Sequence, residues 1–157
     1  MQNVSLCVQQ GECVVLAGEN GSGKSVLMSI IAGLQKKSGG KIFVNGKVAL
    51  IFQDADIQIL GETVKEDVSV GLKNLKIKKD EQEKIIASVL QKVGLLQNMN
   101  SSTRFLSGGQ KRRLAIACML AVNSDIFIFD EPYANLDYSG VKQVNKIIGE
   151  LKNQGKT

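Results

Sequence analysis

The sequence predicts an α/β fold in which a parallel sheet is interrupted by a helical insert. Two short, continuous apolar runs, residues 13–17 and 126–129, are typical of strands buried on both faces of a parallel sheet. A glycine-rich turn follows the first run, and apolar residues then recur at helical spacing from Val26 to Leu34. A strand, a tight turn and a helix in this order indicate the beginning of a βαβ unit.

The remaining elements divide the chain into a core and an insert. Apolar or alternating segments predict further strands at residues 4–8, 41–44 and 48–52. Helical periodicity predicts helices at residues 65–75, 80–93, 108–122 and 138–151. We therefore expect a single domain over residues 1–157, with its core in residues 1–60 and 123–157 and a helical subdomain in residues 61–122.

Composition excludes several classes of protein. With 157 residues, 43% of them apolar and 22% charged, the chain has the make-up of a soluble globular domain. Aromatic residues make up only 4%, so we expect no nucleic-acid partner that stacks its bases on the protein. The longest apolar run, residues 114–122, is about half of the ~20 residues that cross a bilayer, so a role at a membrane needs a partner. Three cysteines without any histidine argue against a disulfide framework or a zinc site, and we expect Cys7, Cys13 and Cys118 to be small buried side chains.

The strongest chemical signal is the run Gly18-Glu19-Asn20-Gly21-Ser22-Gly23-Lys24-Ser25, which fits the phosphate-binding pattern G-x-x-x-x-G-K-[ST]. Glycines let backbone N–H groups approach phosphate oxygens, and a helix that begins at Lys24 points its positive end at them. We expect Lys24 to reach the β- and γ-phosphates and the Ser25 hydroxyl to bind Mg²⁺. The alternative is a flexible Gly/Ser turn, but the run stands between a predicted strand and a predicted helix, as phosphate binding requires. The expected nucleotide-binding residues are Asn20, Gly21, Ser22, Gly23, Lys24, Ser25 and Val26.

A second signal is the apolar run 126–129 followed by Asp130 and Glu131. Ligands bind in the crevice at the carboxyl ends of parallel strands. There, Asp130 is expected to belong to the Mg²⁺ shell and Glu131 to act as the general base for an attacking water. By itself the pattern is weak, because buried strands often end in an acidic residue at the surface. It gains weight from the phosphate-binding pattern earlier in the chain.

A third signal, Leu106-Ser107-Gly108-Gly109-Gln110, opens the helix before that strand. Taken alone, Ser-Gly-Gly could be a helix-capping turn. Together with the other motifs, it resembles the LSGGQ signature of the ABC (ATP-binding cassette) ATPases. The resemblance covers essentially the whole chain in the order of the family: Walker A at 18–25, the Q-loop glutamine at Gln53, the signature at 106–110, Walker B at 126–130 and the D-loop at 134–137.

This resemblance implies a P-loop NTPase fold with a RecA-like parallel-sheet core and an inserted α-helical signature subdomain. It implies ATP and Mg²⁺ as ligands, Glu131, Gln53 and Lys24 as catalytic residues, and Ser25, Gln53 and Asp130 as the Mg²⁺ site. It also implies a head-to-tail dimer with an identical or different second ABC ATPase domain. In that dimer the signature residues act on the nucleotide of the other subunit; they are Ser107, Gly108, Gly109 and Gln110. The D-loop contributes Asp137 as a further site residue.

The cations Lys111, Arg112 and Arg113 stand in the first turn of the signature helix, where they oppose the helix dipole. An anion bound in front of that helix would offset the conflict. The alternative is that these side chains simply point to solvent.

The stretch from Phe52 to Leu60 resembles the FQ-x-P-x-x-Q segment of energy-coupling-factor ATPases, which serve cobalt, nickel and vitamin importers. Gln53 and Gln58 match that segment, whereas Ala55 replaces its proline. Elsewhere, Tyr133 stands in place of the usual threonine after Walker B. Val26 stands where many members have a second hydroxyl, so a contact to the α-phosphate is expected to be missing.

The resemblance predicts the ATP-hydrolysing subunit of a transporter, peripheral on the cytoplasmic face of the cell membrane and bound to a separate integral membrane subunit. The adenine-stacking aromatic residue and the switch histidine of the family have no counterpart here, so we expect a cassette trimmed at both ends, with an apolar strand ending near a histidine beyond Thr157. One alternative is a soluble ABC ATPase of DNA repair or translation, which would need a long coiled coil or tandem cassettes. Another is a non-hydrolysing nucleotide-binding subunit of a heterodimer, against which the intact Glu131 and LSGGQ argue.

Overall fold

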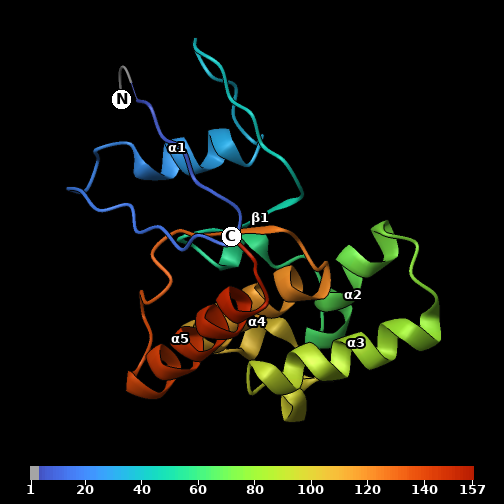
Figure 1. Ribbon diagram of the computed structural model, residues 1–157. Helices are drawn as coiled ribbons and strands as arrows, with labels where there is room; N and C mark the ends of the chain where they lie inside the picture. Colours follow the sequence, from blue (N-terminus) through green and yellow to red (C-terminus); the bar gives the residue numbers. More distant parts are fainter. Residues whose placement is uncertain (1–3) are drawn as a thin grey trace.

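A two-stranded parallel sheet lies at the centre of the computed structural model, which describes residues 4–157. Strand β1 (Val48–Ile51) pairs with β2 (Ile126–Phe129), with Val48 opposite Ile126 and Ile51 opposite Phe129. Helix α1 (Lys24–Ile31) and the N-terminal segment lie on one side of this sheet, and helices α4 (Gly108–Ala121) and α5 (Tyr138–Asn153) lie on the other (Figure 1). The strands pair although residues 52–125 separate them in the chain, as a parallel pair needs a long crossover connection.

The helices between the strands form the main hydrophobic core. Helices α2 (Val64–Asn74) and α3 (Lys79–Lys92) both pack against α4. Val64, Val68, Leu72, Leu90 and Leu114 are completely buried there. Three short 3₁₀ turns connect these helices to the sheet and to one another: η1 (Asp56–Gln58), η2 (Leu96–Asn98) and η3 (Thr103–Phe105).

The helices predicted from sequence periodicity are confirmed to within two residues at each end, apart from the first helix, which ends earlier than its apolar pattern. Helix α1 ends at Ile31 because Gly33, with a φ angle of 74°, closes it in the left-handed conformation. Helix α2 begins with a reciprocal capping box, in which the Thr63 side chain accepts a hydrogen bond from the Glu66 N–H and the Glu66 carboxylate accepts one from the Thr63 N–H. Such ends are determined locally, which is why the sequence predicts them well.

Three predicted strands are wrong: residues 4–8, 13–17 and 41–44 are extended or irregular and belong to no sheet. Val15 is 85% exposed and Phe43 is 93% exposed, so neither lies in a strand buried on both faces. A strand needs a neighbour for its backbone hydrogen bonds, and residues 13–17 make none with β1 or β2. The prediction that all three cysteines are buried is also wrong, because Cys7 and Cys13 are exposed. Met1, Gln2 and Asn3 lie outside the described residues.

Helix α5 brings the chain back to the sheet. After Gly155, whose φ angle is 72°, Thr157 donates its N–H to the Asp125 carbonyl (3.1 Å) and accepts from the Phe127 N–H (2.8 Å). Its hydroxyl also accepts a hydrogen bond from the Gly11 N–H (2.9 Å). The C-terminal residue therefore lies beside the beginning of β2 (Figure 1). Over residues 4–157, each helix is too short or too polar to cross a bilayer.

Candidate nucleotide-binding site

The phosphate loop of residues 18–25 precedes α1 and is largely exposed. Gly21 and Gly23 have φ angles of 79° and 94°, which glycine adopts without strain. Gly23 is the N-cap of α1, and no side chain accepts a hydrogen bond from the first N–H groups of this helix. These donors and the helix dipole together fit the oxygens of a phosphate group.

Lys24 folds back over its own loop. Its Nζ donates hydrogen bonds to the carbonyls of Gly18 and Glu19, each at 2.8 Å. The loop is closed further by a hydrogen bond from the Ser22 N–H to the Glu19 carbonyl (3.2 Å). Because an ammonium group has freely rotating donors on a flexible stem, it can exchange these carbonyls for phosphate oxygens without a change in the loop.

Gln53 and Glu131 meet where the two strands end. Each follows its strand by two residues, and parallel strands place their carboxyl ends at the same edge of a sheet. Gln53 Nε2 donates a hydrogen bond to Glu131 Oε2 at 2.7 Å. Glu131 has a φ angle of 49°, a conformation that costs a non-glycine residue about 1–3 kcal/mol and is common at functional sites. Both side chains are exposed, so a ligand can reach them.

Asp130 has the properties of a cation ligand. It is only 6% exposed, and its N–H donates to the Ile51 carbonyl at 3.0 Å. Its carboxylate accepts no hydrogen bond from any residue in the range 4–157, and its oxygens are not closed off from solvent, so a cation can reach them. The predicted Mg²⁺ ligands Ser25, Gln53 and Asp130 would supply a hydroxyl, an amide and a carboxylate oxygen, the hard donors that Mg²⁺ prefers. These residue types therefore fit the ion.

The signature residues form the N-terminus of α4. Ser107 is the N-cap, its hydroxyl accepts from the Gln110 N–H (3.3 Å), and the Gln110 side chain accepts from the Ser107 N–H (2.8 Å). The capping turn, considered above as an alternative explanation of Ser-Gly-Gly, is thus present. It does not account for Gly108, however, because a Cβ added there would meet no atom within 4 Å. Ser107 and Gly108 are both exposed, which leaves room for a partner to approach.

The D-loop lies against the signature and caps the next helix. A Cβ on Gly109 would come within 3.5 Å of the Leu136 side chain. Asp137 is the N-cap of α5 and accepts hydrogen bonds from the Gly140 N–H (2.8 Å) and the Ser139 hydroxyl (3.1 Å). These hydrogen bonds, that of Gly140 first, lower the pKa of the Asp137 carboxyl from its ordinary value.

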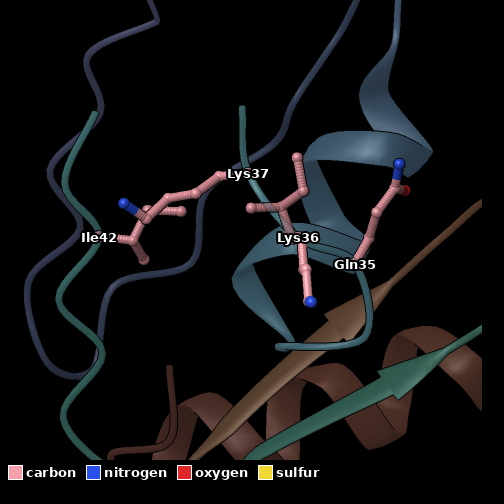
Figure 2. A pocket seen from close by; sticks show the side chains of 5 residues that line it. Gln35, Lys36, Lys37 and Ile42 are labelled. Atoms are coloured by element: carbon pink, nitrogen blue, oxygen red, sulfur yellow. The ribbon is translucent and has the colours of Figure 1, made fainter. Parts of the chain in front are cut away.

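The phosphate loop is not joined to the other half of the candidate site. Within residues 4–157, no hydrogen bond or ion pair connects residues 18–25 with Gln53, Asp130 or Glu131. Helix α1 also buries none of its side chains. A hollow of about 410 Å³ lies at the C-terminal end of α1, away from the phosphate loop. It is lined by Ile30, Gln35, Lys36, Lys37 and Ile42 (Figure 2). Its position excludes it as the place where Lys24 would hold phosphate.

Comparison with known proteins decides the family. A family model described as ABC transporter matches residues 1–134. The chain belongs to the ABC transporter family. This confirms the family predicted from the LSGGQ motif and the motifs around it.

Two curated relatives of this ABC domain are named energy-coupling factor transporter ATP-binding protein EcfA1. The protein of Mycoplasma mobile is 39% identical over 97% of this chain and 60% of its own length. The protein of Mycoplasmoides gallisepticum is 39% identical over 100% of this chain and 61% of its own length. The chain thus spans about 60% of the length of these relatives.

A solved structure supports the same family. The structure of cbiO1 from Clostridium perfringens, described as part of the ABC transporter complex cbiONQ, superposes with a TM-score of 0.82 at 32% identity. The match covers 97% of this chain and 66% of cbiO1. The ABC ATPase fold and the energy-coupling-factor group predicted from residues 52–60 are therefore confirmed.

The structure also gives roles to ABC-domain residues that motifs did not single out. Asp67, only 4% exposed, accepts hydrogen bonds at Oδ1 from the N–H groups of Leu60 (2.6 Å) and Gly61 (2.8 Å). The Cys118 thiol donates to Asp67 Oδ2 (3.2 Å). Burial, together with this carboxylate, raises the pKa of the Cys118 thiol well above its ordinary value. Asp67 therefore fixes the chain shortly after the Q-loop.

Two of the three cations at the start of α4, Lys111 and Arg112, do not simply point to solvent. Lys111 pairs with Asp56 (2.5 Å), and Arg112 is buried against backbone carbonyls. Both contacts are to residues of this chain, so no bound anion is needed to explain these two cations. In the sequence, the one sign that Arg112 is buried is its place among three successive cations near the start of a helix.

Proposed function

We propose that this chain is the ATP-binding and ATP-hydrolysing part of an ABC transporter of the energy-coupling-factor group. The observation that carries the proposal is the 2.7 Å contact between Gln53 and Glu131, beside the buried Asp130, at the carboxyl ends of two parallel strands. The printed names of the relatives, which describe transporter ATP-binding proteins, support the role in transport.

The residues of the chain divide the chemistry among them. The N–H groups of residues 20–26 and the ammonium of Lys24 bind the phosphates, and Ser25, Gln53 and Asp130 hold Mg²⁺. Bound Mg²⁺ neutralises part of the charge on the phosphate oxygens. Glu131 takes a proton from water at one carboxylate oxygen, while the other accepts the hydrogen bond from Gln53 that orients it. An exposed carboxylate in this position can receive the proton of a water that attacks from the open side of the site.

A second ABC ATPase domain, identical or different, completes the site in this proposal. Ser107, Gly108, Gly109 and Gln110 bind the γ-phosphate held by Lys24 of the opposite subunit, and Asp137 lies next to the same interface. The support is the exposure of Ser107 and Gly108 and the empty space in front of Gly108. The loop around Lys24 is also largely exposed, and the Lys24 side chain itself is half-buried.

The mechanical partner is a separate integral membrane subunit on whose cytoplasmic side the chain is peripherally bound. ATP binding closes the pair of cassettes and hydrolysis reopens it, so that the membrane subunit alternates between two states. The relative cbiO1 is described as part of a transporter complex, which supports this arrangement.

Binding of Mg²⁺·ATP to the purified chain tests the proposal. Lys24→Ala removes the cation that the phosphate loop contributes, and we expect ATP affinity measured by calorimetry to fall by at least about tenfold, because charge-assisted contacts to phosphate are the strong ones. Lys36→Ala removes a surface lysine outside the loop and should leave the affinity within about twofold of the wild type. Equal affinity of all three proteins would show that residues 18–25 form only a turn.

A further inference from the structure

Arg112 connects the beginning of the signature helix to both strands of the sheet. Its guanidinium is buried, with 3% of the residue exposed. Nη1 donates to the Phe52 carbonyl at 2.7 Å and, more weakly, to the Asp130 carbonyl at 3.4 Å, while Nη2 donates to the Gln53 carbonyl. One side chain of α4 thereby contacts the residues that follow β1 and the residue that follows β2.

These carbonyls flank the two side chains proposed to act in hydrolysis. Gln53 carries one acceptor of Arg112 on its own backbone, and Glu131 directly follows another acceptor, Asp130. The side chains of Gln53 and Glu131 are joined at 2.7 Å on the exposed side. Arg112 therefore supports this pair from the buried side.

The strand ends need such a donor. β1 ends at Ile51, so the carbonyls of Phe52 and Gln53 lie beyond the hydrogen-bonded ladder. Gln58 partly replaces the ladder, because its side chain accepts from the Phe52 N–H and donates to the Leu50 carbonyl, both at 2.9 Å. Arg112 donates to the Phe52 and Gln53 carbonyls, which Gln58 does not contact. The planar guanidinium can donate to more than one carbonyl at once.

The contact is not a salt bridge, which separates it from the neighbouring cation. The pKa of Arg112 is lowered by burial, and the negative charges of Glu131, Asp130 and Asp54 oppose this effect. Its direct partners are carbonyl dipoles, whose positions it determines. Lys111, one residue earlier, instead pairs with the exposed Asp56, and exposed ion pairs contribute little.

We propose that Arg112 is a positioning residue that holds Gln53 against Glu131 and makes this pair move together with Ser107, which begins the same helix. The inference rests on the proposed function, since it concerns the hydrolytic step. In this proposal Arg112 contacts neither the nucleotide nor the attacking water. Its loss should therefore lower the rate of hydrolysis and leave ATP affinity unchanged.

Three variants of the full chain test the proposal. Arg112→Met keeps the aliphatic stem and removes all donors, Arg112→Lys keeps the charge but cannot bridge the carbonyls in the same plane, and Lys111→Met is the matched control. ATP affinity is measured by calorimetry, turnover by phosphate release, and hydrogen exchange of residues 52–58 in the nucleotide-free protein by mass spectrometry. We expect Arg112→Met to lower kcat by about 10- to 100-fold with ATP affinity within about threefold of the wild type, because small misplacements of reacting groups have effects of this size.

We expect Arg112→Lys to recover part of the lost turnover, and faster exchange of residues 52–58 in Arg112→Met but not in Lys111→Met. Turnover of Arg112→Met within twofold of the wild type, or ATP affinity that falls in parallel with kcat, would overturn the proposal. If Arg112→Met does not fold, the same measurements of kcat, ATP affinity and hydrogen exchange on Arg112→Lys test the proposal. If the wild type binds ATP without hydrolysing it, the proposed function is wrong, whatever the role of Arg112. Unchanged hydrogen exchange of residues 52–58 in the arginine variants would refute the positioning role of Arg112.

Discussion

At the scale of single residues, Asp67 shows how a buried carboxylate can hold a loop in place. One oxygen accepts two backbone N–H groups, those of Leu60 and Gly61, and the other accepts from Cys118. A Cβ on Gly61 would lie 2.3 Å from the Asp67 nitrogen, so the loop passes directly over the start of α2. This close approach requires glycine at position 61 and an acceptor at position 67.

Asp67→Ala should lower the free energy of unfolding by about 1–3 kcal/mol, because it removes a charged acceptor from two partly buried N–H donors. Urea denaturation followed by circular dichroism measures the change. Glu62→Ala serves as the control, since this nearby side chain is exposed, and should shift stability by no more than about 0.5 kcal/mol. If both variants lose the same small amount, water replaces the carboxylate and Asp67 does not hold the loop.

Residues within a local motif were predictable, and residues that depend on distant partners were not. Lys24, Asp130 and Glu131 stand at fixed positions after a strand or within a turn, so their spacing identifies them. The acceptors of Arg112 on residues 52 and 53 are 60 and 59 positions away in the chain, and no local pattern encodes such a contact. The 2.7 Å contact of Gln53 with Glu131 was likewise not predicted, although both residues were named as catalytic.

At the scale of secondary-structure elements, the capping residues of two helices are also proposed site residues. Ser107 caps α4 and Asp137 caps α5, so hydrogen bonds tie the signature and the end of the D-loop to the helices that follow them. The Asp137 carboxyl accepts hydrogen bonds in its ionised form, which is the reason for its lowered pKa. Its stabilising contribution is therefore fully present above the ordinary pKa of 3.8 and disappears as the pH falls through the lower value of the folded state.

Asp137→Ala should lower Tm at neutral pH, because the first turn of α5 loses its acceptor. The difference in Tm between wild type and Asp137→Ala should remain constant down to about pH 3.8 and narrow below it. Thermal melts at a series of pH values measure this difference. Asp137→Asn is the control: its side chain can cap without ionising, so its advantage over alanine should not depend on pH. A difference between wild type and alanine that stays constant below pH 3 would contradict the assignment.

Helices were predicted more accurately than strands for a physical reason. A helix satisfies its backbone hydrogen bonds within its own segment, so periodicity defines α2, α3, α4 and α5. Capping side chains also mark the beginnings of α2, α4 and α5. A strand needs a neighbour, and only β1 and β2 find one among residues 4–157. Residues 13–17 have the composition of a buried strand, but composition cannot supply the partner.

At the scale of the whole molecule, the described residues divide into a well-packed part and an open part. The sheet and helices α2 to α5 share one hydrophobic core, which includes Ile51, Leu72, Leu114 and Val144. The segment before β1 has many exposed apolar side chains, among them Val15, Leu34 and Phe43, and α1 buries none. The phosphate loop belongs to the open part, whereas Gln53, Asp130 and Glu131 belong to the packed part. Nucleotide that binds both parts would therefore join them.

Glu131 is proposed to be the general base for ATP hydrolysis, in a site that a second cassette completes. Glu131→Gln tests this proposal most directly, because the amide keeps the shape of the side chain and can still accept the hydrogen bond from Gln53 but cannot take up a proton. We predict unchanged ATP affinity, turnover reduced by about 10²–10⁴-fold, and an ATP-dependent dimer on size-exclusion chromatography with light scattering. Asp125→Asn, at the opposite end of β2, should hydrolyse ATP like the wild type. Wild-type turnover in Glu131→Gln, with no ATP-dependent dimer, would contradict the account.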